Sequence, residues 1–144
     1  MADERPAFLA QESTNGTWVR VLPDTGANMC FASEAYLAKI GHPVEDPTDA
    51  PEIVIANGDI VQSVGSTHVE LELGPGGREH LLVKVYAFTM PANSALAETL
   101  VLGHDALAGY LLDVTHDPPL IPKSQAALFL HGTAHKPAAF RPPT

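Results

Sequence analysis

The stretch Val21-Leu22-Pro23-Asp24-Thr25-Gly26-Ala27 places an acidic side chain directly after an apolar run. The run favours a β-strand, and Gly26 allows the turn that follows to pass close to another backbone. A carboxylate held just beyond a strand in such a turn is typical of an active site. The alternative is an ordinary turn begun by the aspartate. We take Asp24 as the candidate catalytic residue.

Short runs of β-type sequence, separated by turn residues, surround this stretch. They cover residues 17–22, 52–56, 60–64, 68–73, 80–88 and 100–102. Asn57-Gly58 favours the positive φ angles of a two-residue hairpin, and residues 74–77 form a looser connection. Helix signals are few: Ser33 can cap a segment that runs to Ile40, and residues 103–108 can form a turn or two. The sequence therefore predicts an all-β fold with one or two short helices.

The length and composition fit one globular domain. The chain has 144 residues, of which 45% are hydrophobic and 17% are charged, which is far from the composition of disordered chains. We expect a flexible N-terminal segment over residues 1–14, a single domain over residues 15–123 and a C-terminal tail over residues 124–144. The tail is rich in proline and alanine and has little apolar periodicity.

The charge balance argues against several kinds of partner. Eight Lys and Arg against 17 Asp and Glu give a formal net charge of -9, so the chain lacks the basic stripe that nucleic acid or an anionic membrane attracts. The single cysteine, Cys30, excludes an internal disulfide, and the first ten residues lack the pattern of a signal peptide. We expect a cytoplasmic protein with no nucleic-acid or membrane partner.

Three further features follow Asp24-Thr25-Gly26-Ala27 along the chain: a hairpin at residues 55–59, Gly65, and the stretch Leu102-Gly103-His104-Asp105. In this order they resemble the retropepsins, the aspartic proteases of retroviruses and long-terminal-repeat retrotransposons. The resemblance covers residues 17–121. It implies a closed, barrel-like subunit with one lobe per chain that forms a homodimer, and a flexible flap over residues 53–65 with its tip at Asn57-Gly58.

The resemblance also implies a chemistry. Like charges about 3 Å apart cannot both ionise, so two aspartates that meet share one proton and supply one acid and one base. Because each chain carries one such turn, Asp24 would need the same residue of a second copy. The pair would activate a water that attacks a peptide bond in an extended polypeptide. The expected function is an aspartic endopeptidase that processes a polyprotein, in the cytoplasm or within a virus-like particle, and that needs no metal or cofactor.

Further roles are implied for the residues around Asp24. Thr25 would grip the turn of the opposite subunit, Gly26 would let substrate and partner approach, and Ala27 would pack beside the cleft. The substrate-binding residues would be Asn28, Ala56, Asn57 and Gly58. Gly103 and Asp105 would give structural support to the turn, Asp105 as a carboxylate at the start of a short helix.

Three other sequence features could indicate a different chemistry, but they support it less well than the Asp24 turn supports an aspartic protease. His131 and His135 are spaced like metal ligands on a helix, but Gly132 lies between them and no zinc motif accompanies them. A thiol mechanism through Cys30 would need a histidine nearby in space. Residues 74–77 lack the Lys-Ser/Thr pair of a phosphate loop.

Pro23 departs from the retropepsin pattern. The alternative function is therefore a catalytically silent peptide-binding or dimerisation module.

Overall fold

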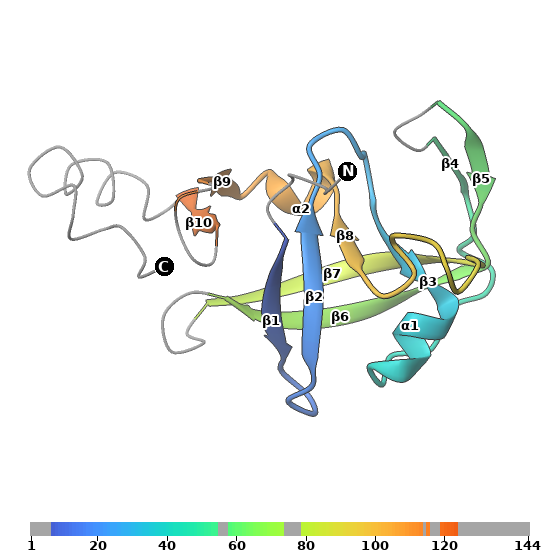
Figure 1. The fold of residues 1–144 in the computed structure, drawn as a ribbon, viewed down its shortest axis with the longest axis horizontal. Coiled ribbons are helices and arrows are strands. Elements are labelled where there is room, and N and C mark those ends of the chain that lie inside the picture. The colour runs from blue at the N-terminus through green and yellow to red at the C-terminus, as the bar shows by residue number, and fades with distance from the viewer. Residues whose placement is uncertain (1–6, 55–57, 74–78, 114, 116–118, 124–144) are drawn as a thin grey trace, which may run out of the picture.

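Six strands of the computed structural model close into a barrel (Figure 1). The structure describes residues 7–54, 58–73, 79–113, 115 and 119–123. Around the barrel the strands follow the order β1-β2-β8-β3-β7-β6. Their bounds are β1 (Phe8–Glu12), β2 (Trp18–Pro23), β3 (Cys30–Ser33), β6 (Gly65–Leu73), β7 (Glu79–Phe88) and β8 (Leu100–Leu102). The all-β, barrel-like fold predicted from the sequence is confirmed.

Two small antiparallel sheets and two short helices accompany the barrel in the described residues. One sheet pairs β4 (Glu52–Val54) with β5 (Ile60–Gln62), and the other pairs β9 (Tyr110–Leu112) with β10 (Leu120–Pro122). Figure 1 shows them on opposite sides of the barrel. The helices α1 (Glu34–Lys39) and α2 (His104–Leu107) follow β3 and β8. No helix in the described part of the chain is long and apolar enough to cross a membrane.

The barrel wall is built chiefly on the long antiparallel hairpin of β6 and β7. Its register runs without interruption over nine residue pairs. Alternate side chains point inward, so that Val69 and Leu71 of β6 and Val83 and Val85 of β7 are buried. Fully burying an aliphatic side chain of this size contributes roughly 1.5–3 kcal/mol. These side chains meet those of β1, β2, β3 and β8 in one apolar core.

The first helix begins where the sequence predicts. The Ser33 hydroxyl accepts a hydrogen bond from the Tyr36 N–H at 2.9 Å, which satisfies one of the N–H groups that a helix start leaves free. Tyr36 lies in the core, and its hydroxyl accepts a hydrogen bond from the Arg20 N–H of β2 at 3.0 Å. The helix ends before Gly41, whose φ of +90° lies in the left-handed region. The cap and Tyr36 together fasten α1 to the barrel.

The expectation of a flexible segment over residues 1–14 is wrong for residues 8–12. They form β1, which pairs with β2 on one side and with β6 on the other, and so closes the barrel. Phe8 and Ala10 are buried. The run is too short for its alternation to stand out in the sequence, and the pairing on both sides is what makes it a strand. Residues 1–6 and the predicted tail over residues 124–144 lie outside the described residues.

The six predicted strands correspond to β2 and to β4 through β8, with ends that differ by at most three residues. The sequence prediction lacks β3, β9 and β10 besides β1. Each of the three is only three or four residues long, which leaves little room for a period-two pattern. The looser connection predicted at residues 74–77 lies outside the described residues.

Glu12 ends β1 with a carboxylate that is fully buried. Its Oε1 accepts a hydrogen bond from the Thr14 N–H at 2.5 Å, and its Oε2 accepts one from the Asn15 N–H at 3.0 Å. The Nε2 atom of His42 lies 3.1 Å from Oε1. Burial raises the pKa of Glu12, but the N–H groups of Thr14 and Asn15 and the contact with His42 outweigh it and hold this pKa below its ordinary value. The carboxylate thus ties the turn between β1 and β2 to the segment after α1.

We expect Glu12→Gln to lower the free energy of unfolding at neutral pH by roughly 1–3 kcal/mol, because hydrogen bonds to a buried charge become weaker ones. The folded-state pKa of Glu12 is lower than its unfolded value. This stabilisation is therefore present above the unfolded pKa and is lost as the pH falls through the folded pKa. Urea denaturation at neutral pH and at about pH 3 should show a difference between parent and variant that shrinks at the acid end.

The control for this prediction is Glu52→Gln, which removes an exposed carboxylate. It should leave the free energy of unfolding nearly unchanged at both pH values, because exposed charges contribute little. A difference between the parent and Glu12→Gln that does not depend on pH would contradict the role given to the buried carboxylate.

Candidate active site

The Asp24 turn joins two strands that are separated in the barrel by a third, because β8 lies between β2 and β3. β8 runs parallel to β2, with Leu22 opposite Val101, and antiparallel to β3, with Phe31 opposite Val101. The Asp24 N–H donates to the Leu102 carbonyl oxygen at 2.9 Å. The turn therefore starts from a strand end that is held on β8.

Pro23 precedes the turn without interrupting this pairing. It lies opposite Leu102 in the parallel register of β2 and β8. Successive backbone nitrogens of a strand point to opposite sides, and the N–H of Asp24 points to β8. The nitrogen of Pro23 therefore points away from β8, and the proline ring removes no hydrogen bond between these two strands.

The turn is organised by the Asp24 side chain itself. Its Oδ1 accepts a hydrogen bond from the Gly26 N–H at 2.9 Å, and its backbone carbonyl oxygen accepts one from the Ala27 N–H at 3.1 Å. Asp24 is half-buried, Thr25 and Gly26 are exposed, and Ala27 is buried. A Cβ atom at Gly26 would lie 3.2 Å from Oδ1, which is tighter than most such contacts. The turn thus presents a carboxylate and exposed backbone at one end of the barrel.

The segment that enters α2 packs against the other side of the turn. The His104 N–H donates to the Ala27 carbonyl oxygen at 2.7 Å, and the Asp105 N–H donates to the Asn28 carbonyl oxygen at 3.3 Å. Gly103 is buried, and a Cβ atom there would lie 2.3 Å from the Met29 carbonyl oxygen. Only a glycine fits at such a distance. The structure therefore places both predicted supporting residues, Gly103 and Asp105, beside the turn.

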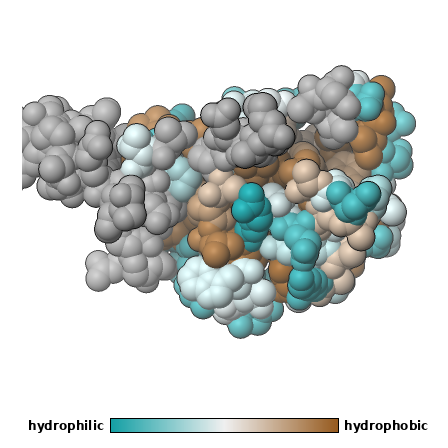
Figure 2. Space-filling model, in the orientation of Figure 1, coloured by the Kyte–Doolittle hydropathy of each residue, from teal (hydrophilic) through white to brown (hydrophobic). Residues whose placement is uncertain are grey.

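The predicted flap falls on the β4–β5 hairpin. Val54 pairs with Ile60, and both are exposed, at 54% and 66%. Figure 2 shows hydrophobic surface in this region. Gly58 is exposed with φ +88°, and a Cβ atom there would meet nothing within 4 Å. The other two predicted substrate-binding residues of the hairpin, Ala56 and Asn57, lie outside the described residues.

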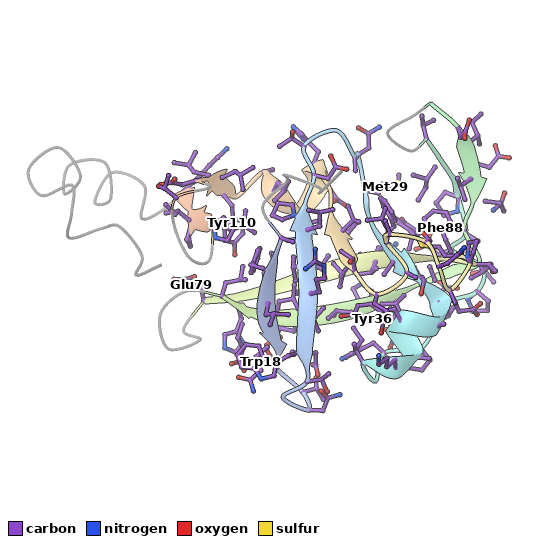
Figure 3. All side chains as sticks on the ribbon, in the orientation of Figure 1. Trp18, Met29, Tyr36, Glu79, Phe88 and Tyr110 are labelled. Carbon is purple, nitrogen blue, oxygen red and sulfur yellow. The ribbon has the colours of Figure 1, made fainter. Side chains whose placement is uncertain are left out.

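An apolar cluster joins the hairpin to the active-site turn. Ile53 of β4 is buried in it, and so is Ala27 of the turn. Phe31 and Phe88 contact each other edge to face, with ring centroids 5.7 Å apart. Figure 3 shows Phe88 at the end of β7 that lies nearer the hairpin, while Glu79 marks the opposite end. The remaining fully buried members of the cluster are Leu22 and Val101.

Competing chemistries find less support in the geometry. The thiol of Cys30 is buried, and burial raises its pKa well above the usual range, with the neighbouring Asp105 carboxylate adding to the rise. The thiol therefore stays protonated and is not poised as a nucleophile. No group of three His, Cys, Asp or Glu in the described residues could hold a metal ion. The paired His131 and His135 lie outside the described residues.

Sequence reasoning missed the contact between Cys30 and Asp105. The Cys30 thiol donates to the Asp105 Oδ1, with Sγ 3.2 Å from the oxygen. The apolar run that begins at Cys30 could have been recognised as a strand following the turn, and the start of α2 was recognised. No local signal could have shown that positions 75 residues apart meet.

Among solved structures, the chain is similar to the EIAV protease complexed with the inhibitor HBY-793. The two are 23% identical, the match covers 74% of this chain and 88% of that chain, and the TM-score is 0.51. It is also similar to the simian foamy virus (mac) protease in solution, at 20% identity, 71% and 91% coverage and a TM-score of 0.43. No protein-family profile and no curated protein matches the sequence.

These similarities concern the fold. The chain has the retropepsin-like fold of the retroviral aspartic proteases, one closed barrel with two short helices in its described residues. The resemblance inferred from the Asp24 turn, the hairpin and the segment around Gly103 is confirmed at that level.

We expect Gly103→Ala to lower the free energy of unfolding by about 3 kcal/mol, because its Cβ atom would collide with the Met29 backbone and not with a flexible side chain. Gly109→Ala is the matched control, since nothing lies within 4 Å of a Cβ atom there and its φ is not positive. Chemical denaturation of the three proteins measures the difference. Equal stability of the two variants would refute the close approach of α2 to the turn.

Proposed function

We propose that the chain is an aspartic-type endopeptidase that works as a homodimer and pairs Asp24 of each copy. The observation that carries the proposal is the half-buried Asp24 carboxylate, held by its own turn at the end of β2 in a retropepsin-like barrel. Pro23 was the feature that favoured a catalytically silent relative. Because it removes no hydrogen bond between β2 and β8, it gives that alternative little support.

The dimer follows from the number of carboxylates that the chemistry needs. Peptide hydrolysis by a carboxyl pair requires one ionised member and one protonated member, and each chain supplies one Asp-Thr-Gly turn. Thr25 and Gly26 are exposed in the single chain, so they are available to a second copy related by a two-fold axis. In this dimer Thr25 grips the opposite turn, and Gly26 lets the two backbones come close.

The pair acts on a water molecule bound between the two subunits. The ionised carboxylate takes a proton from the water, and the resulting hydroxide attacks the carbonyl carbon of the peptide bond. The protonated carboxyl donates to the carbonyl oxygen as negative charge develops there. When the tetrahedral intermediate collapses, the C–N bond breaks, and the leaving nitrogen receives the proton that the carboxylate took from the water. No covalent intermediate with the enzyme forms.

The substrate is an extended polypeptide segment. The β4–β5 hairpin is anchored to the barrel by Ile53 and carries a glycine with positive φ, Gly58, in its connection. Such a hairpin can close over a bound strand and offer backbone hydrogen bonds to it. A polyprotein that contains this chain is the substrate that fits the proposal, with processing in the cytoplasm or in a virus-like particle.

We expect Asp24→Asn to reduce cleavage of an unfolded protein substrate at mildly acidic pH by at least about a hundred-fold, because the amide cannot accept the proton of the water. Both proteins are assayed with a metal chelator present. Glu34→Gln, which removes an exposed carboxylate of α1, should retain the parent rate. Equal cleavage by the parent and Asp24→Asn would reject the pair as the catalytic centre, and a folded, dimeric parent without activity would favour the binding module.

Mixing the two proteins tests whether the carboxylates come from different chains. With about a nine-fold excess of Asp24→Asn, random exchange leaves roughly a tenth of the parent activity, because most parent chains then sit in dimers with one functional aspartate. The parent concentration is held constant, and the mixture is equilibrated before the assay. Glu34→Gln added in the same excess should raise the total rate instead. A parent rate that is insensitive to the excess variant would reject the shared site.

A further inference from the structure

Cys30 is the only cysteine of the chain, and it occupies the first position of β3 with no exposed surface. Its Sγ atom lies among polar groups of residues 103–106. The thiol donates to the Asp105 Oδ1 at 3.2 Å, and the sulfur accepts a hydrogen bond from the Gly103 N–H at 3.4 Å. Gly103 and Asp105 belong to the segment that begins α2, with Gly103 as the N-cap and Asp105 as the second residue of the helix. The thiol is therefore a side-chain link between the end of the Asp24 turn and that segment.

This link completes a series of contacts along the turn. The Asp24 N–H donates to the Leu102 carbonyl oxygen. The N–H groups of His104 and Asp105 donate to the carbonyl oxygens of Ala27 and Asn28. These are backbone bonds. At the far end of the turn, the contact with the same segment is made by the Cys30 side chain, and so it depends on the residue type.

The protonated state of Cys30 suits the role. Burial keeps the thiol neutral, so that it retains its hydrogen and can donate to a carboxylate. The Asp105 Oδ1 also accepts a hydrogen bond from the Ala106 N–H at 2.8 Å, which orients the carboxylate toward the sulfur. An alanine at position 30 would leave the buried Gly103 N–H without this acceptor and the Asp105 carboxylate without the thiol donor.

We propose that Cys30 and Asp105 act together as positioning residues for the active-site turn. By holding the end of the turn on α2, the pair sets where the Asp24 carboxylate stands relative to its counterpart in the second subunit. Small displacements of a reacting group reduce the rate strongly while leaving substrate affinity almost unchanged. The inference rests on the proposed protease function, because its main consequence appears in kcat.

The test is a double-mutant cycle in the chain of 144 residues with Cys30→Ala, Asp105→Ala and the combined variant. Each single variant should lower kcat about ten-fold with KM changed less than about two-fold, and the combined variant should lose little more than either. Cys30→Ser keeps a donor and an acceptor and should restore kcat to within about three-fold of the parent. Losses of kcat that multiply in the combined variant would overturn the pairing.

A matched control separates positioning from lost packing. Val85 of β7 is fully buried and lies opposite Cys30 in the β3–β7 register, but it has no part in the contacts with α2 described above. Val85→Ala should lower thermal stability at least as much as Cys30→Ala while leaving kcat near the parent value. If the control loses as much kcat as Cys30→Ala, the effect is general loosening and the inference is wrong.

A second readout does not depend on cleavage. Because the chain has one thiol, the rate at which an aromatic disulfide reagent labels the folded protein reports how often Cys30 becomes accessible. Asp105→Ala should raise this rate about ten-fold, and an unchanged rate would overturn the coupling. A parent protein whose thiol is labelled slowly but which cleaves no substrate would overturn the protease function together with this inference. An active parent with an equally active Cys30→Ala variant would overturn the inference alone.

Discussion

The close approach of Gly103 to the Met29 backbone is the constraint on which the rest of the structure depends. A Cβ atom at Gly103 would lie 2.3 Å from the Met29 carbonyl oxygen, so this contact requires a glycine. Because the two backbones meet there, β8 can lie between β2 and β3 and still lead directly into α2. The Asp24 turn is then enclosed on one side by a strand end and on the other by a helix start. Its half-buried carboxylate is held between them by the Gly26 N–H.

Two buried polar side chains, Glu12 and Cys30, have pKa values that are shifted in opposite directions. Glu12 is surrounded by N–H donors and His42, which stabilise its charge and lower its pKa despite burial. Cys30 is buried beside a carboxylate, so its neutral form is the stable one and its pKa rises. In each case the preferred protonation state is the one that can form the hydrogen bonds. Each side chain thereby links segments that lie far apart in the sequence.

Sequence reasoning recovered the elements whose signal is local. The β6–β7 hairpin alternates buried and outward residues over two long strands, and Ser33 is followed by a helix that it caps. Sequence reasoning failed for β1, which was predicted to be part of a flexible segment. This strand has only two inward apolar residues within five positions. Such a run becomes a strand because β2 and β6 lie on both sides of it. This pairing depends on the tertiary structure and cannot be predicted from strand propensity alone.

The sequence by itself determined the Asp-Thr-Gly turn after an apolar strand, the hairpin over residues 52–62, the start of α1 and the glycine before α2. Each of these depends on residues within a few positions of one another, where backbone geometry and capping act directly. Only the tertiary structure decided that β8 lies between β2 and β3, that Glu12 is buried against His42, and that Cys30 meets Asp105. These contacts join positions 30 to 80 residues apart, and closure of the barrel is what brings them together.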